Sequence, residues 1–145
     1  MNARRETSII EATDRLDIIE LLNRHQIYID LADAQRYAEL YAPDGKYESQ
    51  FASATGRSDI AEMFRRLRAS GFTTNKRHFT GPPMIDVERD RATALSYWWV
   101  ADYAGEHPNV FATGTYQDEL QRLNGVWKIT RRVQSMDTSK TTRVA

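Results

Sequence analysis

The 145-residue sequence contains no cysteine, which excludes disulfide bonds, thiolate metal sites and cysteine nucleophiles. The formal net charge is zero, because twenty basic residues balance twenty acidic ones. The sequence also has no long basic stripe. We therefore expect no nucleic-acid partner. No apolar run approaches the ~20 residues that span a bilayer, and the first residues lack the apolar core of a signal peptide. The expectation is a cytoplasmic protein without membrane association.

The residues that are present predict one globular domain. The composition is 41% hydrophobic and 28% charged, which is ordinary for a folded protein. A chain of this length buries about two-thirds of its unfolded surface as a single domain. No repeat or linker divides it. We predict one domain over residues 1–136 and a polar C-terminal tail over residues 137–145.

The first half of the chain predicts three helices. Apolar residues recur at steps of three and four between Ile18 and Ile29, which is the spacing of one helical face. Helix-capping and turn residues set the expected boundaries. From N to C terminus we expect a long helix capped by Thr13 or Asp14, a helix over 34–41, a turn at 43–45, a strand over 46–51 and a helix over 58–69.

The second half predicts an antiparallel sheet with extended segments over 75–80, 84–88, 92–103, 110–123 and 126–133. Asn124-Gly125 between two alternating runs is a strong hairpin signal. A two-residue turn there pairs Leu123 with Val126 and Arg122 with Trp127. Further along the hairpin it predicts the pairings of Leu120 with Ile129, Asp118 with Arg131 and Tyr116 with Val133. One face of this hairpin, formed by Tyr116, Leu120, Trp127, Ile129 and Val133, is expected to line the core or a cavity.

This order of elements predicts an α+β fold. Three N-terminal helices would pack inside a curved, mostly antiparallel sheet, which gives a cone-shaped barrel. The open end of such a cone forms a cavity suited to a small molecule. Three scattered histidines make a poor metal-ligand set, and no Gly-rich phosphate loop is present, so neither a metal nor another cofactor is expected.

The three histidines differ in context. His107 lies in a polar loop and is expected to be solvated. His25 lies on the apolar face of the first helix, where it is either a buried histidine bonded to a neighbour or part of the pocket wall. His78 lies in a strand, with Lys76 and Thr80 on the same face.

Asp30 lies near the end of the first helix, where the helix dipole disfavours a negative charge. A carboxylate there needs a partner, and a histidine is a suitable one because the pair orients the imidazole as a base. Sequence spacing does not show whether Asp30 and His78 meet. On the strand over 92–103, alternation puts Trp98 and Asp102 on one face and Tyr97 and Trp99 on the other. Either one face lines the cavity and the other forms an inter-subunit surface, or all of these residues pack in the core.

Three segments resemble the SnoaL-like branch of the nuclear transport factor 2-like superfamily: RHFTGP (77–82), YIDLADAQRYAELYAPDG (28–45) and LNGVWKI (123–129). Within it the chain is most similar to scytalone dehydratase and hexachlorocyclohexane dehydrochlorinase, over roughly residues 10–135. The resemblance implies the cone fold and a homo-oligomer, with a trimer favoured over a dimer.

The resemblance also implies a catalytic dyad, because Asp30 and His78 match the family's positions. In those enzymes the histidine removes a proton from carbon while a group leaves the neighbouring carbon, and the aspartate orients and charges the imidazole. The implied activity is that of a cofactor-independent lyase, a dehydratase or related elimination enzyme, with a small apolar cyclic or aromatic substrate. The alternative is a non-catalytic ligand-binding protein, or a structural subunit such as a ring-hydroxylating dioxygenase β subunit.

Departures from the family's pattern limit this expectation. Scytalone dehydratase has a second histidine at Asp102, a tyrosine at Ser49 and an asparagine near Tyr116, so dehydration of scytalone itself is not expected. The pocket arginine of the dehydrochlorinase falls at Arg132. The predicted hairpin puts Arg132 on the outer face unless a bulge re-aims the strand. The candidate substrate-binding residues are His25, Ser49, Trp98, Asp102, Tyr116 and Arg132.

Overall fold

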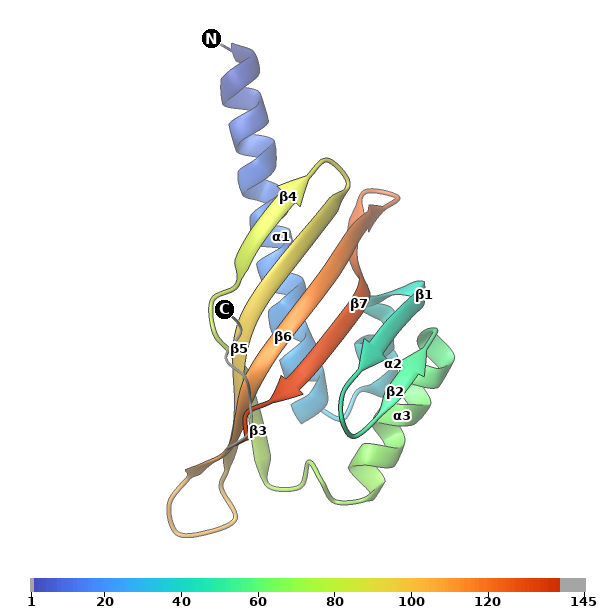
Figure 1. Cartoon of the computed structure of the whole chain (residues 1–145), viewed down its shortest axis with the longest axis vertical. Helices are drawn as coiled ribbons and strands as arrows, with labels where there is room; N and C mark the ends of the chain where they lie inside the picture. Colours follow the sequence, from blue (N-terminus) through green and yellow to red (C-terminus); the bar gives the residue numbers. More distant parts are fainter. Residues whose placement is uncertain (1, 139–145) are drawn as a thin grey trace.

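The computed structural model describes residues 2–138 and confirms the α+β cone (Figure 1). Residues 139–145 of the predicted tail lie outside the described residues. The elements are α1 (Asn2–Asp30), α2 (Ala34–Glu39), β1 (Tyr41–Glu48), β2 (Ser53–Thr55), α3 (Arg57–Ala69), β3 (Lys76–Thr80), β4 (Met84–Glu88), β5 (Arg91–Asp102), β6 (Asn109–Leu123) and β7 (Val126–Met136).

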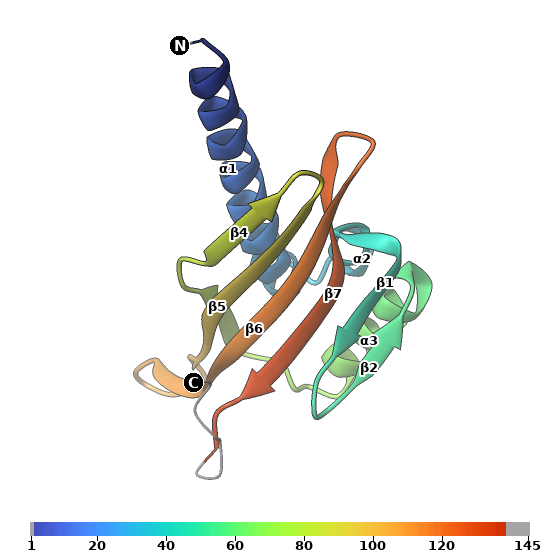
Figure 2. The same cartoon turned by 45° about the horizontal axis from the view of Figure 1, so that its top comes forward.

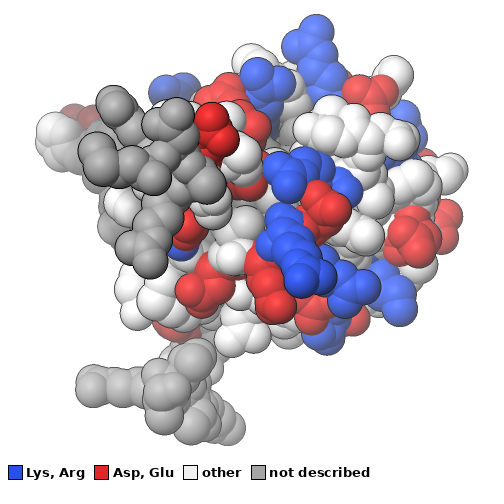
Figure 3. Space-filling model, turned by 90° about the horizontal axis from the view of Figure 1, so that it is seen from above, with Lys and Arg blue, Asp and Glu red and all other residues white. Residues whose placement is uncertain are grey.

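The strands form one curved sheet in the order β2-β1-β7-β6-β5-β3, with β4 also paired to β5. Every pairing is antiparallel except that of β1 with β7. Helix α1 runs along the sheet, and its N-terminal end projects beyond it (Figures 1 and 2). No helix in the described part of the chain combines the length and apolarity of a membrane span. Acidic and basic side chains lie next to one another over the face seen in Figure 3.

The core joins the helices to the inner face of the sheet. Ile18 and Leu22 on α1 are almost fully buried and belong to one cluster with Leu120 and Ile129. A smaller cluster contains Trp98, Val100 and Tyr116 and borders the cavity described below. Hydrophobic burial of these side chains is what holds α1 inside the curved sheet.

The predicted cap at Thr13 or Asp14 is wrong, because α1 begins at Asn2 and continues through both residues. Asp14 has a different role. Its buried carboxylate accepts hydrogen bonds from Arg122 Nη1 at 2.5 Å and from Trp127 Nε1 at 3.1 Å. These bonds fix the middle of α1 to the β6–β7 hairpin.

The end of α1 has the hydrogen bonds of a Schellman motif, which fixes the position of Asp30. The Asp33 N–H donates to the Tyr28 carbonyl at 3.0 Å, and the Ala32 N–H donates to the Ile29 carbonyl at 3.1 Å. Ala32 has a positive φ of 58°. Asp33 then caps α2 by accepting from the Arg36 N–H at 3.0 Å. Asp30 is therefore the last residue of α1, and these hydrogen bonds hold it at a fixed position.

The predicted turn at 43–45 is wrong, since these residues belong to β1. Because β1 starts at Tyr41, the predicted helix over 34–41 is also too long, and α2 ends at Glu39. The pairing of β1 with β7 shifts between Tyr41 and Lys46. At Gly45 an added Cβ would lie 2.9 Å from Tyr41 Cβ and 3.0 Å from the Ile129 carbonyl oxygen. The Pro-Asp-Gly sequence therefore bends a buried strand and does not end it.

The β6–β7 hairpin confirms the predicted turn, with φ of 50° at Asn124 and 80° at Gly125, and the pairing of Leu120 with Ile129. Beyond that pair the register shifts at Thr130, so Asp118 pairs with Arg132 and Gln117 with Val133. The predicted pairings of Asp118 with Arg131 and of Tyr116 with Val133 are wrong.

A β-bulge explains the shift. It turns Arg132 inward, where its guanidinium pairs with Asp118, and it places Val133 opposite the exposed Gln117 instead of in the core. The sequence left two alternatives for Arg132, an outer-face position or a bulge that turns it inward. The structure has the bulge.

Candidate active site

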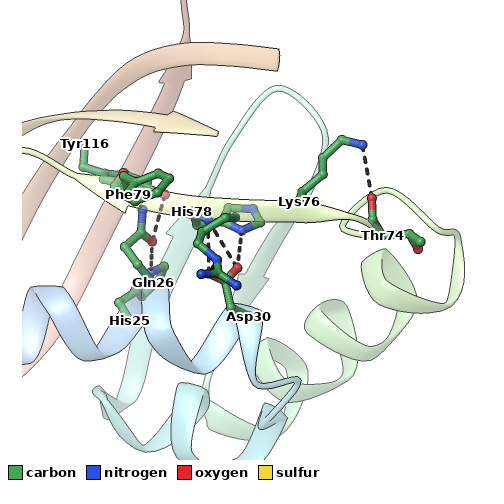
Figure 4. Close-up of polar contacts among 9 residues, drawn as sticks. His25, Gln26, Asp30, Thr74, Lys76, His78, Phe79 and Tyr116 are labelled. Atoms are coloured by element: carbon green, nitrogen blue, oxygen red, sulfur yellow. Dashed lines mark hydrogen bonds and ion pairs between the residues drawn. The ribbon is translucent and has the colours of Figure 1, made fainter. Parts of the chain in front are cut away.

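Asp30 and His78 meet at the edge of a cavity (Figure 4). The His78 Nδ1 lies 2.9 Å from Asp30 Oδ1, and the His78 backbone N–H donates to both carboxylate oxygens at 3.3 Å. The exposed guanidinium of Arg77 lies 4.0 Å from Asp30 Oδ2. One carboxylate thus binds both the ring and the backbone of the same histidine, which fixes the ring's orientation.

This geometry assigns different roles to the two ring nitrogens of His78. An ionised carboxylate only accepts hydrogen bonds, so the Nδ1 facing Asp30 carries the proton. The Nε2 then has the lone pair, and no partner for it is found among the described residues. Because His78 lines the cavity, this nitrogen is available to a molecule bound there. The pair can act as an oriented base.

The cavity lies between the inner face of the sheet and helices α1 and α3, and its free volume is about 80 Å³. Most of its wall is apolar, with Met63, Phe64, Val100, Ala112 and Met136 among the lining residues. Typical small-molecule sites begin at roughly 300 Å³. A cyclic ligand therefore has to occupy the mouth as well as the closed inner part.

Three phenylalanines from separate segments line the outer part of the cavity. The ring centroids of Phe51 and Phe72 are 5.7 Å apart, and those of Phe72 and Phe111 are 6.2 Å apart. All three are exposed, so the cavity reaches the surface between them. We call these three side chains the aromatic mouth.

His25, which also lines the cavity, has both ring nitrogens occupied. Gln26 Nε2 donates to the Phe79 carbonyl at 3.1 Å, so its Oε1 faces His25 and accepts from Nδ1–H at 3.0 Å. The His25 Nε2 lies 3.1 Å from the Tyr41 hydroxyl, which donates to it. Burial lowers the pKa of His25 well below its ordinary value, and the nearby Arg132 charge lowers it further. His25 is therefore a neutral, buried histidine with no free nitrogen.

Gln26 connects this cluster to the dyad. Its amide binds the carbonyl of Phe79, the residue that follows His78 on β3, and its Oε1 also accepts from the Tyr116 hydroxyl at 3.4 Å (Figure 4). Sequence reasoning missed Gln26 as a site residue. Its position one helical turn before Asp30 is the signal that could have found it.

Besides His25, three predicted residues line the cavity: Tyr116, Trp98 and Ser49. Trp98 places its ring there, while its Nε1–H donates to the Thr115 carbonyl at 3.1 Å. The ring lies directly on Gly114, where an added Cβ would be 2.6 Å from an indole carbon. Ser49 also lines the cavity, but its hydroxyl organises the β1–β2 turn by donating to the Ala52 carbonyl.

Asp102 and Arg132 are not among the residues that line the cavity. Asp102 binds Lys76 Nζ at 3.2 Å, and Lys76 does line it. Arg132 is fully buried, with Nε and Nη2 bound to Asp118 at 2.6 and 2.8 Å. Its guanidinium lies 3.9 Å from the centre of the Tyr116 ring, so it contacts the back of a cavity residue.

Within residues 2–138, no group of three or more histidine, aspartate or glutamate side chains is placed to hold a metal ion. The groups that line the cavity are an imidazole base, phenols, hydroxyls, the Gln134 amide and two cationic side chains, Arg68 and Lys76, in a mostly apolar wall.

Comparisons with known proteins agree with this fold. Residues 11–133 match the family described as the SnoaL-like domain. None of the curated proteins matches the sequence. An NTF2-like protein with a cystatin-like fold from Novosphingobium aromaticivorans is 29% identical, over 97% of this chain and 91% of that chain, with a TM-score of 0.81.

Two further solved structures are similar. A protein of unknown function with a cystatin-like fold from Nostoc punctiforme is 28% identical, over 88% of this chain and 94% of that chain, with a TM-score of 0.81. A β subunit assigned to an aromatic-ring-hydroxylating dioxygenase from Novosphingobium aromaticivorans is 17% identical, over 93% of this chain and 96% of that chain, with a TM-score of 0.72, and shows the fold alone. Because the family match spans most of the sequence, this chain belongs to the SnoaL-like domain family, with the NTF2-like cone fold.

Proposed function

We propose that the protein is a cofactor-independent lyase, a dehydratase or related elimination enzyme, in which His78 is the general base and Asp30 orients it. The observation that carries this proposal is the 2.9 Å contact between His78 Nδ1 and Asp30 Oδ1, with His78 on the cavity wall. The resemblance of the segments around both residues to two elimination enzymes supports the same function.

In the proposed reaction, His78 Nε2 takes a proton from a substrate carbon. The electrons of that C–H bond form the new C=C bond, and the group on the neighbouring carbon leaves with the electrons of its own bond. The Nε2 proton then passes to the leaving group or to water. Asp30 stabilises the imidazolium between these steps. A positioned general base contributes typically ~10²–10⁴-fold.

The wall of the cavity supports a small, mainly apolar cyclic or aromatic substrate. Trp98 offers a ring face, while Ser49 and Tyr116 are polar groups on the same wall. In this proposal His25 acts on the substrate indirectly, by holding Gln26 and hence Tyr116. Arg132 acts through the Tyr116 ring, and Asp102 acts through Lys76.

Turnover of a substrate panel tests this proposal. The panel contains cyclic β-hydroxyketones, followed by the absorbance of the conjugated enone, and halogenated cyclohexanes, followed by halide release. His78→Gln and Asp30→Asn should each abolish turnover without lowering the melting temperature substantially. His107→Gln, at an exposed loop residue, is the matched control and should retain full activity. An active His78→Gln protein would end this mechanism.

The second candidate is a non-catalytic subunit, which the structural likeness to a dioxygenase β subunit favours. A scaffold has no need of an oriented imidazole facing a cavity, so the Asp30–His78 contact argues for the enzyme. Co-purification with a larger iron–sulfur protein, together with an inactive panel, would favour the scaffold.

We further propose that the chain self-associates, as a trimer in preference to a dimer, through the outer face of the sheet. Phe79 and Trp99 stack there with centroids 5.2 Å apart, and Tyr97 is largely exposed nearby on β5. Aromatic side chains of this kind are enriched at interfaces between proteins.

A further inference from the structure

Gln134 lies on the cavity wall because of the β7 bulge. Without the register shift at Thr130, Arg131 and Val133 would face inward. With it, the inward positions are Arg132, Gln134 and Met136, and both Gln134 and Met136 line the cavity. Gln134 pairs with Tyr116 on β6, so the two polar side chains are neighbours on the same wall.

A hydrogen bond from Tyr47 sets the orientation of the Gln134 amide. The Tyr47 hydroxyl donates to Gln134 Oε1. Burial raises the pKa of Tyr47 far above its ordinary value, so the phenol keeps the proton that it donates. The oxygen end of the amide is thereby occupied, and the Nε2 end, with its two N–H groups, has no protein partner among the described residues.

Three other donors on the wall are already used within the protein. Trp98 Nε1–H binds the Thr115 carbonyl, and both the Tyr116 hydroxyl and His25 Nδ1–H bind Gln26 Oε1. Gln134 Nε2 differs from these three because it is a directed donor that is left unused in a mostly apolar wall. Arg68 also lines the cavity, but its side chain is exposed to solvent, whereas Gln134 is half-buried. A donor in such a site discriminates strongly for a ligand that supplies an acceptor.

We propose that Gln134 is a specificity-determining residue, and that its Nε2–H binds an acceptor oxygen of the substrate, so that the preferred substrates are cyclic carbonyl compounds. His78 enters the cavity from β3 and Gln134 from β7, with β5 and β6 between these strands. The carbonyl oxygen is held on the β7 side while the rest of the ring extends toward His78. This inference rests on the proposed function only in taking the cavity as the substrate site.

Cyclohexanone is the probe, because it is small, apolar and has one acceptor oxygen. In the wild type its bound carbonyl stretch should lie below the value in hexane, and its binding should shift the Gln134 side-chain NH₂ resonances. Gln134→Met keeps the side-chain length but lacks the donor. In that variant the stretch should return toward the hexane value, and binding should weaken about five- to tenfold, the effect of one neutral hydrogen bond.

Gln117→Met is the matched control, because Gln117 lies in the same hairpin with its side chain exposed; it should leave both readings unchanged. Should Gln134→Met fold poorly, Tyr47→Phe provides a second variant, which removes the bond that orients the amide and should broaden the carbonyl band. An unchanged stretch in Gln134→Met, unmoved Gln134 NH₂ resonances in the wild type, or no binding of cyclohexanone would each overturn the proposal.

The two proposals fail separately. His78→Gln should leave the carbonyl stretch of cyclohexanone unchanged while it removes turnover. If turnover survives that change and the stretch still depends on Gln134, only the proposed reaction is wrong. If turnover needs His78 and the stretch is independent of Gln134, only the role of Gln134 is wrong.

Discussion

Two histidines border the same cavity, and their partners make them chemically different. His78 contacts a carboxylate, which stabilises the imidazolium formed when the ring accepts a proton. His25 contacts an amide and a phenol, and its burial and the nearby Arg132 charge disfavour the imidazolium more than the Gln26 hydrogen bond favours it. A buried position alone therefore does not make a histidine a base. The groups that contact its two ring nitrogens decide whether it can act as one.

The lowered pKa of His25 predicts a pH dependence of stability. Below about pH 6.5 the unfolded chain protonates this ring while the folded protein does not, so the free energy of unfolding falls as the pH falls. Between pH 7.5 and 5.5, urea titrations should show a loss about 1 kcal/mol larger in the wild type than in His25→Gln. His107→Gln should behave as the wild type does. An equal loss in all three proteins would contradict the buried, neutral state of His25.

The Arg132–Asp118 pair predicts a large stability effect. Both side chains are fully buried, and the pair is bidentate. Burial alone would lower the pKa of Arg132, but the Asp118 carboxylate raises it above its ordinary value. Asp118→Leu leaves the guanidinium buried without its counter-charge and should cost about 3–5 kcal/mol in urea denaturation.

The double variant Asp118→Leu/Arg132→Met removes both charges and should recover most of that loss. A loss below about 1 kcal/mol in the single variant would show that water reaches the pair, contrary to its burial.

At the scale of elements, the strand alternation and the Asn124-Gly125 signal were sufficient to predict the hairpin, because both are local. The bulge at Thr130 was not predictable, since it depends on Asp118 being inside to receive Arg132. For the same reason the local sequence places the start of α1 too late. Asp14 is a good capping residue locally, but its carboxylate is used by Arg122 and Trp127 from the far end of the chain.

The same difference between local signals and long-range contacts applies to the candidate site. Asp30 and His78 were identifiable by residue type, by their place on a helix end and a strand, and by resemblance. Gln26 and Gln134 were not, because an amide becomes informative only when its partners show which end is free.

The end of α1 gives a prediction at this scale. Ala32 has a left-handed conformation, with φ of 58°, which a side chain disfavours by about 1–2 kcal/mol. Ala32→Gly removes that cost but increases the freedom of the unfolded chain, so the net gain should be about 0.5–1 kcal/mol. Thermal unfolding measures it, and panel turnover should not change, because Asp30 keeps its place. A lower melting temperature in Ala32→Gly would argue against the Schellman end.

At the scale of the whole molecule, the curved sheet has two faces with different surfaces. The inner face carries the dyad and the cavity, while the outer face exposes Tyr97 and the stacked pair of Phe79 and Trp99. If this outer face joins copies of the chain, the cavity opening at the aromatic mouth can remain free in the assembly.

Sedimentation measurements test that arrangement. Replacing Tyr97 and Trp99 with lysine puts positive charge at the proposed interface, and the assembly should dissociate to monomers. Val126→Lys, at an exposed position of the β6–β7 turn, is the control and should remain assembled. A wild-type monomer, or an assembly that survives the double substitution, would contradict the proposed interface.

Removal of the carbon-bound proton tests the central claim most directly. When the carbon that loses the proton carries deuterium, breaking the C–D bond is slower, so turnover of a panel substrate labelled there should slow. We expect this isotope effect in the wild type and in His107→Gln, and a fall in turnover of about 10²–10⁴-fold in His78→Gln. Turnover at the wild-type rate in His78→Gln would show that another group removes the proton.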